Sequence, residues 1–425
     1  MLAFKLFILV SMYHQTFRTR YLCANLFAIC FFFSVMLLLV SCSEKSPAEH
    51  YGFITRLGRD TISIESVIRQ GNTLTSDEVD RFPAVRVRRT VVGLNTDGSI
   101  RHLEMNIHTP GEPENQRECK VIADVTRDSV HLSKTDGTGT LNRDFATHGA
   151  IIVAHVPQMY SLYELYFAAA LKHAASLKLA AGTTVEERQF YIDREFDRFP
   201  LGRVHVRLLD SGKAEITHDW LAGTGEAMVD SNGHMLSYSG ARTTYLVKVN
   251  RLASPPDIKS IAERFEAMET KTGTVKELSV RDTLHAQIGN TMFTVDYGRP
   301  LLRGRTLLGD VLPYDRIWRT GANQATQFTT SAPVKLAGMQ VPAGTYTLWT
   351  DPHTSGVDLI VNKQAGQWGT DYNASRNLGV ARITSQTLPA PVEEFTISIV
   401  PNGARHGTLV MEWGSFRWTA QIETQ

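Results

Sequence analysis

The residues best suited to chemistry in the C-terminal third of the chain are arginines. They lie near one another in the sequence, beside an indole and an amide: Arg299, Arg305, Trp318, Arg319 and Asn323. A guanidinium binds carboxylate, phosphate or sugar hydroxyl groups through a rigid fork of donors, and an indole offers a flat stacking face. The set predicts either a polar ligand-binding cleft or structural ion pairs that fix the loops. The acids available for such pairs are Asp296, Asp310 and Asp315.

A cysteine near the N-terminus has a different predicted chemistry. Cys42 ends the sequence Leu-Val-Ser-Cys, directly after the uncharged apolar run Tyr21–Val40, and Arg18 and Arg20 precede that run. A cationic start, an apolar middle and a small residue before the cleavage point are typical of a secretion signal, and here they form a lipobox. We expect residues 1–41 to be removed and the Cys42 thiol to be lipidated. The alternative is an ordinary membrane-spanning helix, because the run is long enough to cross a bilayer.

The lipobox resembles that of bacterial lipoproteins, in which a residue such as Ser43, rather than Asp, is typical of sorting to the outer membrane. A start at Met12 instead of Met1 would give the signal a more usual length. Residues 42–49 would then tether the body by its lipid to the inner leaflet of the outer membrane, facing the periplasm. Three of the 44 basic residues and none of the 43 acidic residues lie in the signal. The nearly neutral remainder argues against a nucleic-acid partner.

No catalytic, metal or cofactor site is predicted. His102, Glu104 and His108 share one face of an alternating segment, but the two histidines are about 20 Å apart in an extended strand. His353 and Asp358 lie near a turn, and Cys119 is the one cysteine left besides Cys42 in the processed chain. The sequence contains no Gly-x-Ser-x-Gly elbow, His-Glu-x-x-His helix or phosphate-binding loop.

The elements that position these residues are mainly strands. Residues 50–155 alternate between apolar and polar positions around turns, and the pattern returns after residue 201. Between them, residues 157–179 place aromatic and aliphatic side chains at helical spacing, and a shorter helix is predicted for residues 185–196. We therefore predict a curved antiparallel sheet with an inserted helix over residues 50–253. A helix and linker follow at 254–279.

Residues 280–425 combine short strands with Gly, Pro and Asn turns, which predicts an all-β sandwich. The ordered segments in this region are Tyr-Gly-Arg-Pro from Tyr297, Ile-Trp-Arg-Thr-Gly-Ala-Asn-Gln from Ile317, Val-Pro-Ala-Gly-Thr-Tyr from Val341, and Trp368-Gly369. This succession resembles the domain-of-unknown-function family 2911, which occurs in bacterial secreted and envelope proteins. The resemblance implies a fold and a compartment but no activity. It also adds Gln324 to the predicted ligand-binding residues, at a position where the family usually has Glu.

We therefore expect a mainly β bacterial envelope lipoprotein with a non-catalytic binding or structural role. Its expected contacts are the membrane, through the lipid anchor, and a ligand that is lipid-like in the first domain or small and polar in the second. The alternative is a hydrolase that acts on an envelope or nutrient substrate through a site in the C-terminal domain. A lipid binder predicts an apolar cavity beneath the inserted helix, whereas an enzyme predicts acids or histidines that converge in one cleft.

Overall fold

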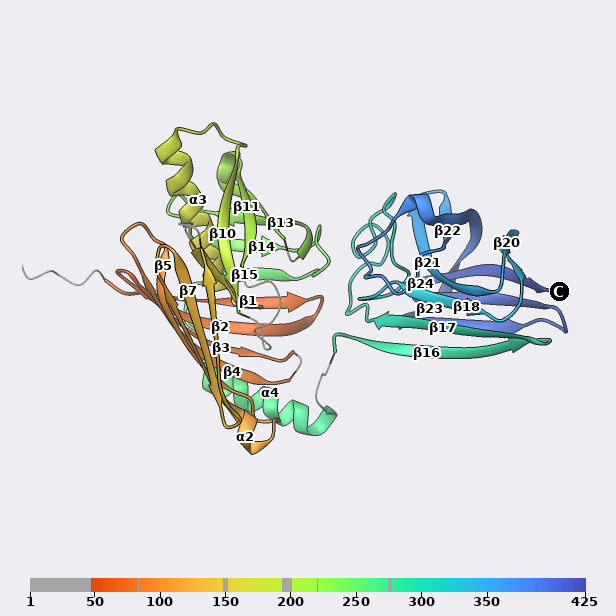
Figure 1. Ribbon diagram of the computed structural model, residues 1–425, viewed down its shortest axis with the longest axis horizontal. Helices are drawn as coiled ribbons and strands as arrows, with labels where there is room; N and C mark the ends of the chain where they lie inside the picture. The colour runs from red at the N-terminus through yellow and green to blue at the C-terminus, as the bar shows by residue number, and fades with distance from the viewer. Residues whose placement is uncertain (1–46, 83, 148–151, 193–200, 220, 274–276) are drawn as a thin grey trace, which may run out of the picture. The chain divides into compact units, whose positions relative to one another are not determined.

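The computed structural model describes residues 47–82, 84–147, 152–192, 201–219, 221–273 and 277–425. The predicted signal and Cys42 lie outside these residues. Within them the protein is mainly β, with one inserted helix in a large N-terminal sheet and a separate C-terminal sheet, which confirms the predicted fold class (Figure 1).

The described residues from 49 to 252 form a sheet of 15 strands made of two meanders. The first meander contains β1 (Glu49–Leu57), β2 (Asp60–Gln70), β3 (Thr73–Asp80), β4 (Arg86–Leu94), β5 (Ile100–His108), β6 (Glu118–Val125), β7 (Ser129–Asp136) and β8 (Gly139–Ala146), with the short helix α2 (Glu114–Arg117) before β6. The second contains β9 (Ile152–His155), β10 (Thr184–Tyr191), β11 (Leu201–Leu208), β12 (Lys213–His218), β13 (Leu221–Val229), β14 (Met235–Ser239) and β15 (Lys248–Leu252), with the 3₁₀ turn η2 (Asp210–Gly212) before β12. The meanders meet where β1 pairs antiparallel with β15, in the register Gly52 to Leu252.

The inserted helix lies inside the curve of this sheet (Figure 1). The 3₁₀ turn η1 (Tyr160–Leu162) leads into α3 (Tyr163–Leu177), which ends at Lys178 in the left-handed conformation. Tyr166 and Phe167 are fully buried against the sheet. Each such side chain contributes about 1.5–3 kcal/mol of burial free energy.

The predicted helix at residues 185–196 is wrong where the structure describes it. Residues 184–191 form β10, and Val185, Glu187 and Gln189 are buried at alternating positions. That period of two is the strand signature, and the pairing of β10 with β11 determines the local conformation. Residues 193–196 lie outside the described residues.

A second helix covers the convex face of the sheet. Helix α4 (Ile258–Thr272) begins at Asp257, whose side chain accepts a hydrogen bond from the Ser260 N–H. Its apolar stripe includes Ile261 and Phe265 and packs against outward-facing residues of β2 and β3, including Ile64 and Val79. In β2 and β3, apolar side chains therefore point outward toward α4. The side chains at the alternate positions of these strands point into the interior of the sheet.

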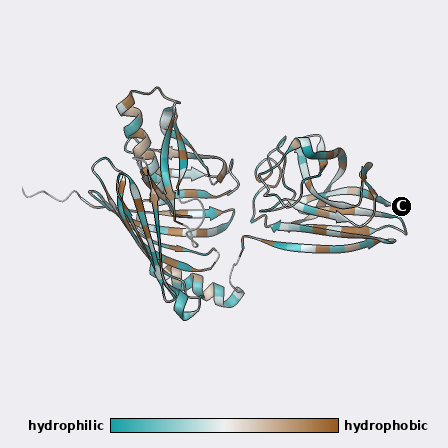
Figure 2. Cartoon of the chain, in the orientation of Figure 1, coloured by the Kyte–Doolittle hydropathy of each residue, from teal (hydrophilic) through white to brown (hydrophobic). Residues whose placement is uncertain are grey.

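The C-terminal region forms a sheet of nine described strands around its own core. The strands are β16 (Ser279–Ile288), β17 (Thr291–Pro300), β18 (Thr326–Thr330), β19 (Val334–Leu336), β20 (Met339–Val341), β21 (Gly344–His353), β22 (Gly356–Asn362), β23 (Asn377–Pro401) and β24 (His406–Thr424), with the 3₁₀ turn η3 (Ala374–Arg376) before β23. The pairing of β23 with β24 changes register between Thr387 and Thr396. Buried residues of both long strands contribute to the one core. Alternating apolar and polar residues along both sheets are visible in Figure 2.

Candidate functional site

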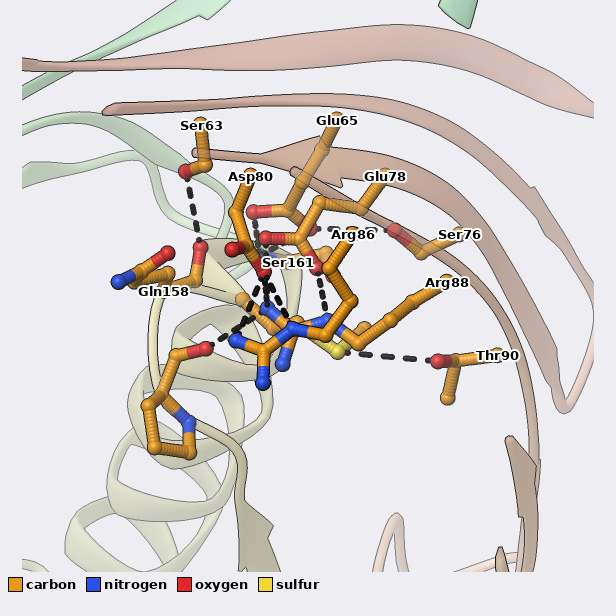
Figure 3. A network of polar contacts seen from close by, with 12 residues as sticks. Ser63, Glu65, Ser76, Glu78, Asp80, Arg86, Arg88, Thr90, Gln158 and Ser161 are labelled. Carbon is orange, nitrogen blue, oxygen red and sulfur yellow. Dashed lines mark hydrogen bonds and ion pairs between the residues drawn. The ribbon is translucent and has the colours of Figure 1, made fainter. Parts of the chain in front are cut away.

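A stripe of polar side chains crosses the interior of the N-terminal sheet (Figure 3). Strand alternation directs these residues of β2, β3 and β4 inward, opposite to the outward residues that contact α4. The stripe contains Ser63, Glu65, Ser76, Glu78, Asp80, Arg88 and Thr90, all of them buried. Isolated charges are not stable in such an environment, so their partners determine what the stripe can do.

Two arginines neutralise two of the three acids. Arg88 makes a bidentate ion pair with Glu78, at 2.8 Å for both nitrogens, and lies 3.0 Å from Asp80. It also donates to the Pro157 carbonyl at 2.9 Å, which ties the sheet to the chain just before η1. Arg86 approaches Asp80 with Nε at 3.0 Å and a terminal nitrogen at 2.9 Å. Arg88 is therefore the central residue of this buried network.

Among the described residues, no arginine makes a direct contact with the third acid, Glu65. It accepts hydrogen bonds from the backbone N–H groups of Tyr160 and Ser161 and from the Ser76 hydroxyl. Burial, followed by repulsion from Glu78, raises the pKa of Glu65 to about 8. A protonated Glu65 leaves two acids facing two arginines, so the cluster as a whole is neutral near pH 7.

A cavity of about 370 Å³ lies beside this cluster, lined by residues of the first meander, of the segment before η1 and of the end of β10. Its apolar wall consists of Phe82, Met105, Ile107, Val121, Val156, Pro157 and Ile192. Arg86 and Arg88 also line it, together with Lys134 and Gln116, whereas Glu65, Glu78 and Asp80 do not. The arginines therefore separate these three acids from the cavity. Two other acids, Glu112 and Asp136, do line it.

The space beneath α3 is filled by packed rings. Tyr163 lies edge-on to Tyr166, with centroids 5.6 Å apart, and Tyr166 donates to Gln189 at 2.8 Å. His155 and His218 lie in the same cluster, and burial lowers the pKa of both imidazoles, that of His218 to about 3. The aromatic helix therefore belongs to the core, and the cavity lies next to the segment that precedes it.

In the C-terminal domain two of the predicted ligand-binding arginines are occupied by other contacts. Arg299 pairs with Asp282 at 3.2 Å and with Glu394 at 2.8 Å. Arg305 donates to the carbonyls of Leu301 and Leu302, at 2.8 and 2.9 Å. Both arginines hold the backbone in place. The acids expected as partners pair elsewhere, as Asp296 does with Arg281 and Asp315 with His353.

The remaining predicted residues occupy one loop. Trp318 stacks on Trp413, with centroids 5.5 Å apart and planes at 19°. Trp318, Arg319 and Asn323 line one cavity, which Arg305 also reaches, whereas Arg299 and Gln324 do not line it. Gln324 is exposed and pairs its backbone with Trp368. No acid is found among the described residues that line this cavity.

His102 and His353 contact acidic side chains, and Cys119 lines the cavity beside the buried cluster. His102 contacts Asp124 at 2.7 Å across neighbouring strands, and His353 lies 3.3 Å from Asp358. The hydrogen bond that the His353 imidazole donates to Asp315 raises the pKa of His353, and burial raises the pKa of the half-buried Cys119 thiol. In the part of the chain that the structure describes, no three His, Cys, Asp or Glu side chains are grouped to hold a metal ion.

Sequence reasoning missed the interior cluster although a signal for it was present. Glu78 and Asp80, like Arg86 and Arg88, are two residues apart, so each pair shares a face of its strand. Apolar valines alternate with them, as Val79 and Val87 show, and either set could have faced inward. Helix α4, which packs on the valines, resolves that choice.

Solved structures similar to this chain include two proteins. One is a DUF1089 family protein from Pseudomonas aeruginosa, with 17% identity and a TM-score of 0.29, over 47% of this chain and 94% of that chain. The other is a beta-barrel-like protein of the domain of unknown function DUF1849 from Brucella abortus, with 10% identity and a TM-score of 0.30, over 48% and 94%. No curated protein matches this chain.

The C-terminal sheet can be assigned more closely. The residues that build it, from the start of β16 nearly to the end of β24, correspond to the segment in which the ordered Gly, Trp, Arg and Pro motifs occur. Residues 279–422 match the model of the family described as "Protein of unknown function (DUF2911)", so the C-terminal third of this chain is a DUF2911 domain.

Proposed function

We propose that this chain is a non-catalytic binding protein of the bacterial envelope and that its N-terminal sheet holds a small apolar, lipid-like ligand. The observation that carries the proposal is the cavity beside the buried cluster. Its volume of about 370 Å³ lies at the lower end of the range usual for ligand sites, roughly 300–1,000 Å³. That size suits one acyl chain or a comparable apolar molecule.

The composition of the cavity wall supports binding rather than catalysis. Met105, Val121, Val156 and Ile192 are buried and present only hydrocarbon or thioether surface. The polar groups on the wall include Arg86 and Lys134, which suit the acidic end of an amphipathic molecule. Cys119 lies on this wall together with Glu112 and Asp136, but burial raises the pKa of its thiol and disfavours the reactive thiolate, so a hydrolase is not favoured here. The described C-terminal residues that line the cavity beside Arg319 include no acid, which likewise gives no support to a hydrolase.

The envelope location rests on the sequence around Cys42. Lipidation of that thiol would attach the body to the inner leaflet of the outer membrane, with both sheets in the periplasm. Among the described residues, no helix has the length and apolar character needed to cross a bilayer. A lipid-anchored protein that binds an apolar ligand would act at the surface of the membrane that contains such lipids.

The test is native mass spectrometry of the gently purified protein, followed by a titration with cis-parinaric acid, a fluorescent fatty acid. We expect a co-purifying lipid that is lost on denaturation, and saturable binding of the probe. Replacing the cavity residue Val121 by Trp should fill the space and weaken probe binding at least tenfold, while Val280→Trp, at an exposed strand position, should leave it unchanged. A bare mass together with equal probe binding by both variants would refute the proposal.

A further inference from the structure

Arg319 differs from the other arginines of the C-terminal domain. Arg299 and Arg281 form ion pairs with acids, and so do the exposed Arg382 and Arg417. Arg319 is half-buried, its Nε atom is fully covered, and no acceptor for that atom is found among the described residues. Burial lowers the pKa of Arg319, and no acid opposes that effect. A covered guanidinium nitrogen without an acceptor is costly, so it needs an explanation.

The loop that carries Arg319 is held rigidly by its neighbours. Trp318 exchanges two backbone hydrogen bonds with Thr350, at 2.7 and 2.9 Å. The Thr326 hydroxyl donates to the Thr320 carbonyl at 2.6 Å, and Thr320 takes the left-handed conformation at a φ of 51°. Backbone strain of this kind persists only where surrounding contacts enforce it. The position of Arg319 is therefore fixed before any ligand arrives.

The stem of Arg319 lies directly on Gly369. A Cβ atom at Gly369 would come within 1.8 Å of the Arg319 Cδ, so glycine is required there. The Gly369 N–H donates to the Asn323 carbonyl at 3.0 Å, which joins the two segments that flank the arginine. Asn323 itself is left-handed, at a φ of 61°. Two segments far apart in the sequence thus cooperate to place one side chain.

Among the C-terminal residues that line the cavity beside Arg319 are aromatic and small side chains. Trp349 and Tyr372 are among them, with ring centroids 4.9 Å apart, and Gly369 and Thr370 add little bulk. A fixed guanidinium next to aromatic surface matches a molecule with one carboxylate and a flat or apolar body. We propose that Arg319 is the anion-binding residue of a ligand site in the DUF2911 domain and that its ligand is a small organic carboxylate. This site is separate from the lipid-binding cavity and does not depend on it.

The uncompensated charge also predicts an unusual stability pattern. A ligand carboxylate supplies the partner that the free protein lacks, so the free protein bears the cost and the complex does not. A residue that only supports the fold would behave in the opposite way, because its removal would break contacts that the fold needs. Binding residues are often retained at the expense of stability for this reason.

The experiment compares thermal unfolding of the wild type, Arg319→Met and Arg382→Met, each with benzoate, acetate or the neutral isostere benzamide. We expect Arg319→Met to unfold at the same or a higher temperature than the wild type when free. Benzoate should raise the unfolding temperature of the wild type and of Arg382→Met in a dose-dependent way, and benzamide should not. Loss of charge-assisted hydrogen bonds should weaken benzoate binding by Arg319→Met by about tenfold or more.

Two results would overturn the inference. One is a lower unfolding temperature for free Arg319→Met combined with no effect of benzoate or acetate on the wild type, which would make Arg319 a structural residue. The other is an equal effect of benzoate and benzamide, since charge would then play no part. If Arg319→Met does not fold, Arg319→Lys provides the same comparison, because a lysine keeps the charge but loses the bidentate fork. Weaker benzoate binding by that variant supports the inference, and unchanged binding contradicts it.

Discussion

Replacement of Glu65 by Gln tests whether the interior cluster is neutral near pH 7. The carboxyl is fully buried, and its pKa is raised from 4.5 to about 8. Because the pKa of Glu65 is higher in the folded chain, its contribution to the free energy of unfolding is complete below pH 4.5 and is lost as the pH rises through 8. In the unfolded chain Glu65 ionises above 4.5, whereas in the folded chain it stays protonated until the pH nears 8.

The magnitude follows from the shift. One pKa unit corresponds to about 1.4 kcal/mol, so titration of Glu65 should lower the free energy of unfolding by about 2 kcal/mol between pH 6 and pH 8. The amide in Glu65→Gln keeps an oxygen for the N–H groups of Tyr160 and Ser161 and cannot ionise. This contribution to the pH dependence should therefore be missing from the variant.

The assay is urea unfolding at pH 6, 7 and 8 for the wild type, Glu65→Gln and Glu263→Gln, an exposed control on α4. Burial lowers the pKa values of His155 and His218, so their contribution to the stability of the protein is lost as the pH falls below the pKa that a histidine has in the unfolded chain. This loss occurs in all three proteins. Their effect cancels in the comparison. The wild type should lose about 2 kcal/mol relative to Glu65→Gln across this range, and the control should follow the wild type. Parallel pH curves for all three proteins would refute a protonated Glu65.

Three further predictions concern packing and charge, each measured by urea unfolding. Arg88→Met should cost about 3–5 kcal/mol because it leaves Glu78 and Asp80 without their shared partner, and a loss under about 1 kcal/mol would contradict the network. Phe167→Ala should cost about 3–5 kcal/mol, while Leu177→Ala at the exposed end of α3 should change stability by less than about 0.5 kcal/mol; equal effects would argue against α3 as a core helix. Gly369→Ala should cost about 1–3 kcal/mol because its Cβ would collide with the Arg319 stem and lie 2.4 Å from the Asn323 carbonyl oxygen, and a neutral result would contradict this close packing.

The strand pattern and the inserted helix were predictable because they depend on local periodicity. Alternation in β5 around His102 and the helical spacing in α3 both appear in the structure where the sequence indicates them. The segment from Val185 was misassigned because a short stretch of charged and apolar residues suits a helix or a strand, and pairing with β11 decides between them. Local patterns carry no information about that neighbour.

The candidate sites were less predictable for a related reason. The sequence places Arg299, Arg305 and Arg319 close together, but only tertiary contacts reveal that the first two are occupied by other groups. The interior position of Arg88 likewise depends on α4, which begins 170 residues later and covers the opposite face of the sheet. In both regions the residue types indicate which ligands a site could bind. The contacts within the protein determine which side chains remain available to bind them.

The pairing of β1 with β15 has a consequence for how the N-terminal sheet folds. Each meander consists mainly of hairpins between neighbouring strands, so β1 to β8 can assemble from local contacts alone. The pairing of Gly52 with Leu252 instead closes a loop of about 200 residues, which costs conformational entropy. We therefore expect β1 and β15 to pair late in folding. Until then β1 has an unpaired edge at the centre of the future sheet, where another chain can add a strand. Aggregation of this protein during folding should therefore begin at β1, and a sequence cut before β15 should leave that edge permanently open.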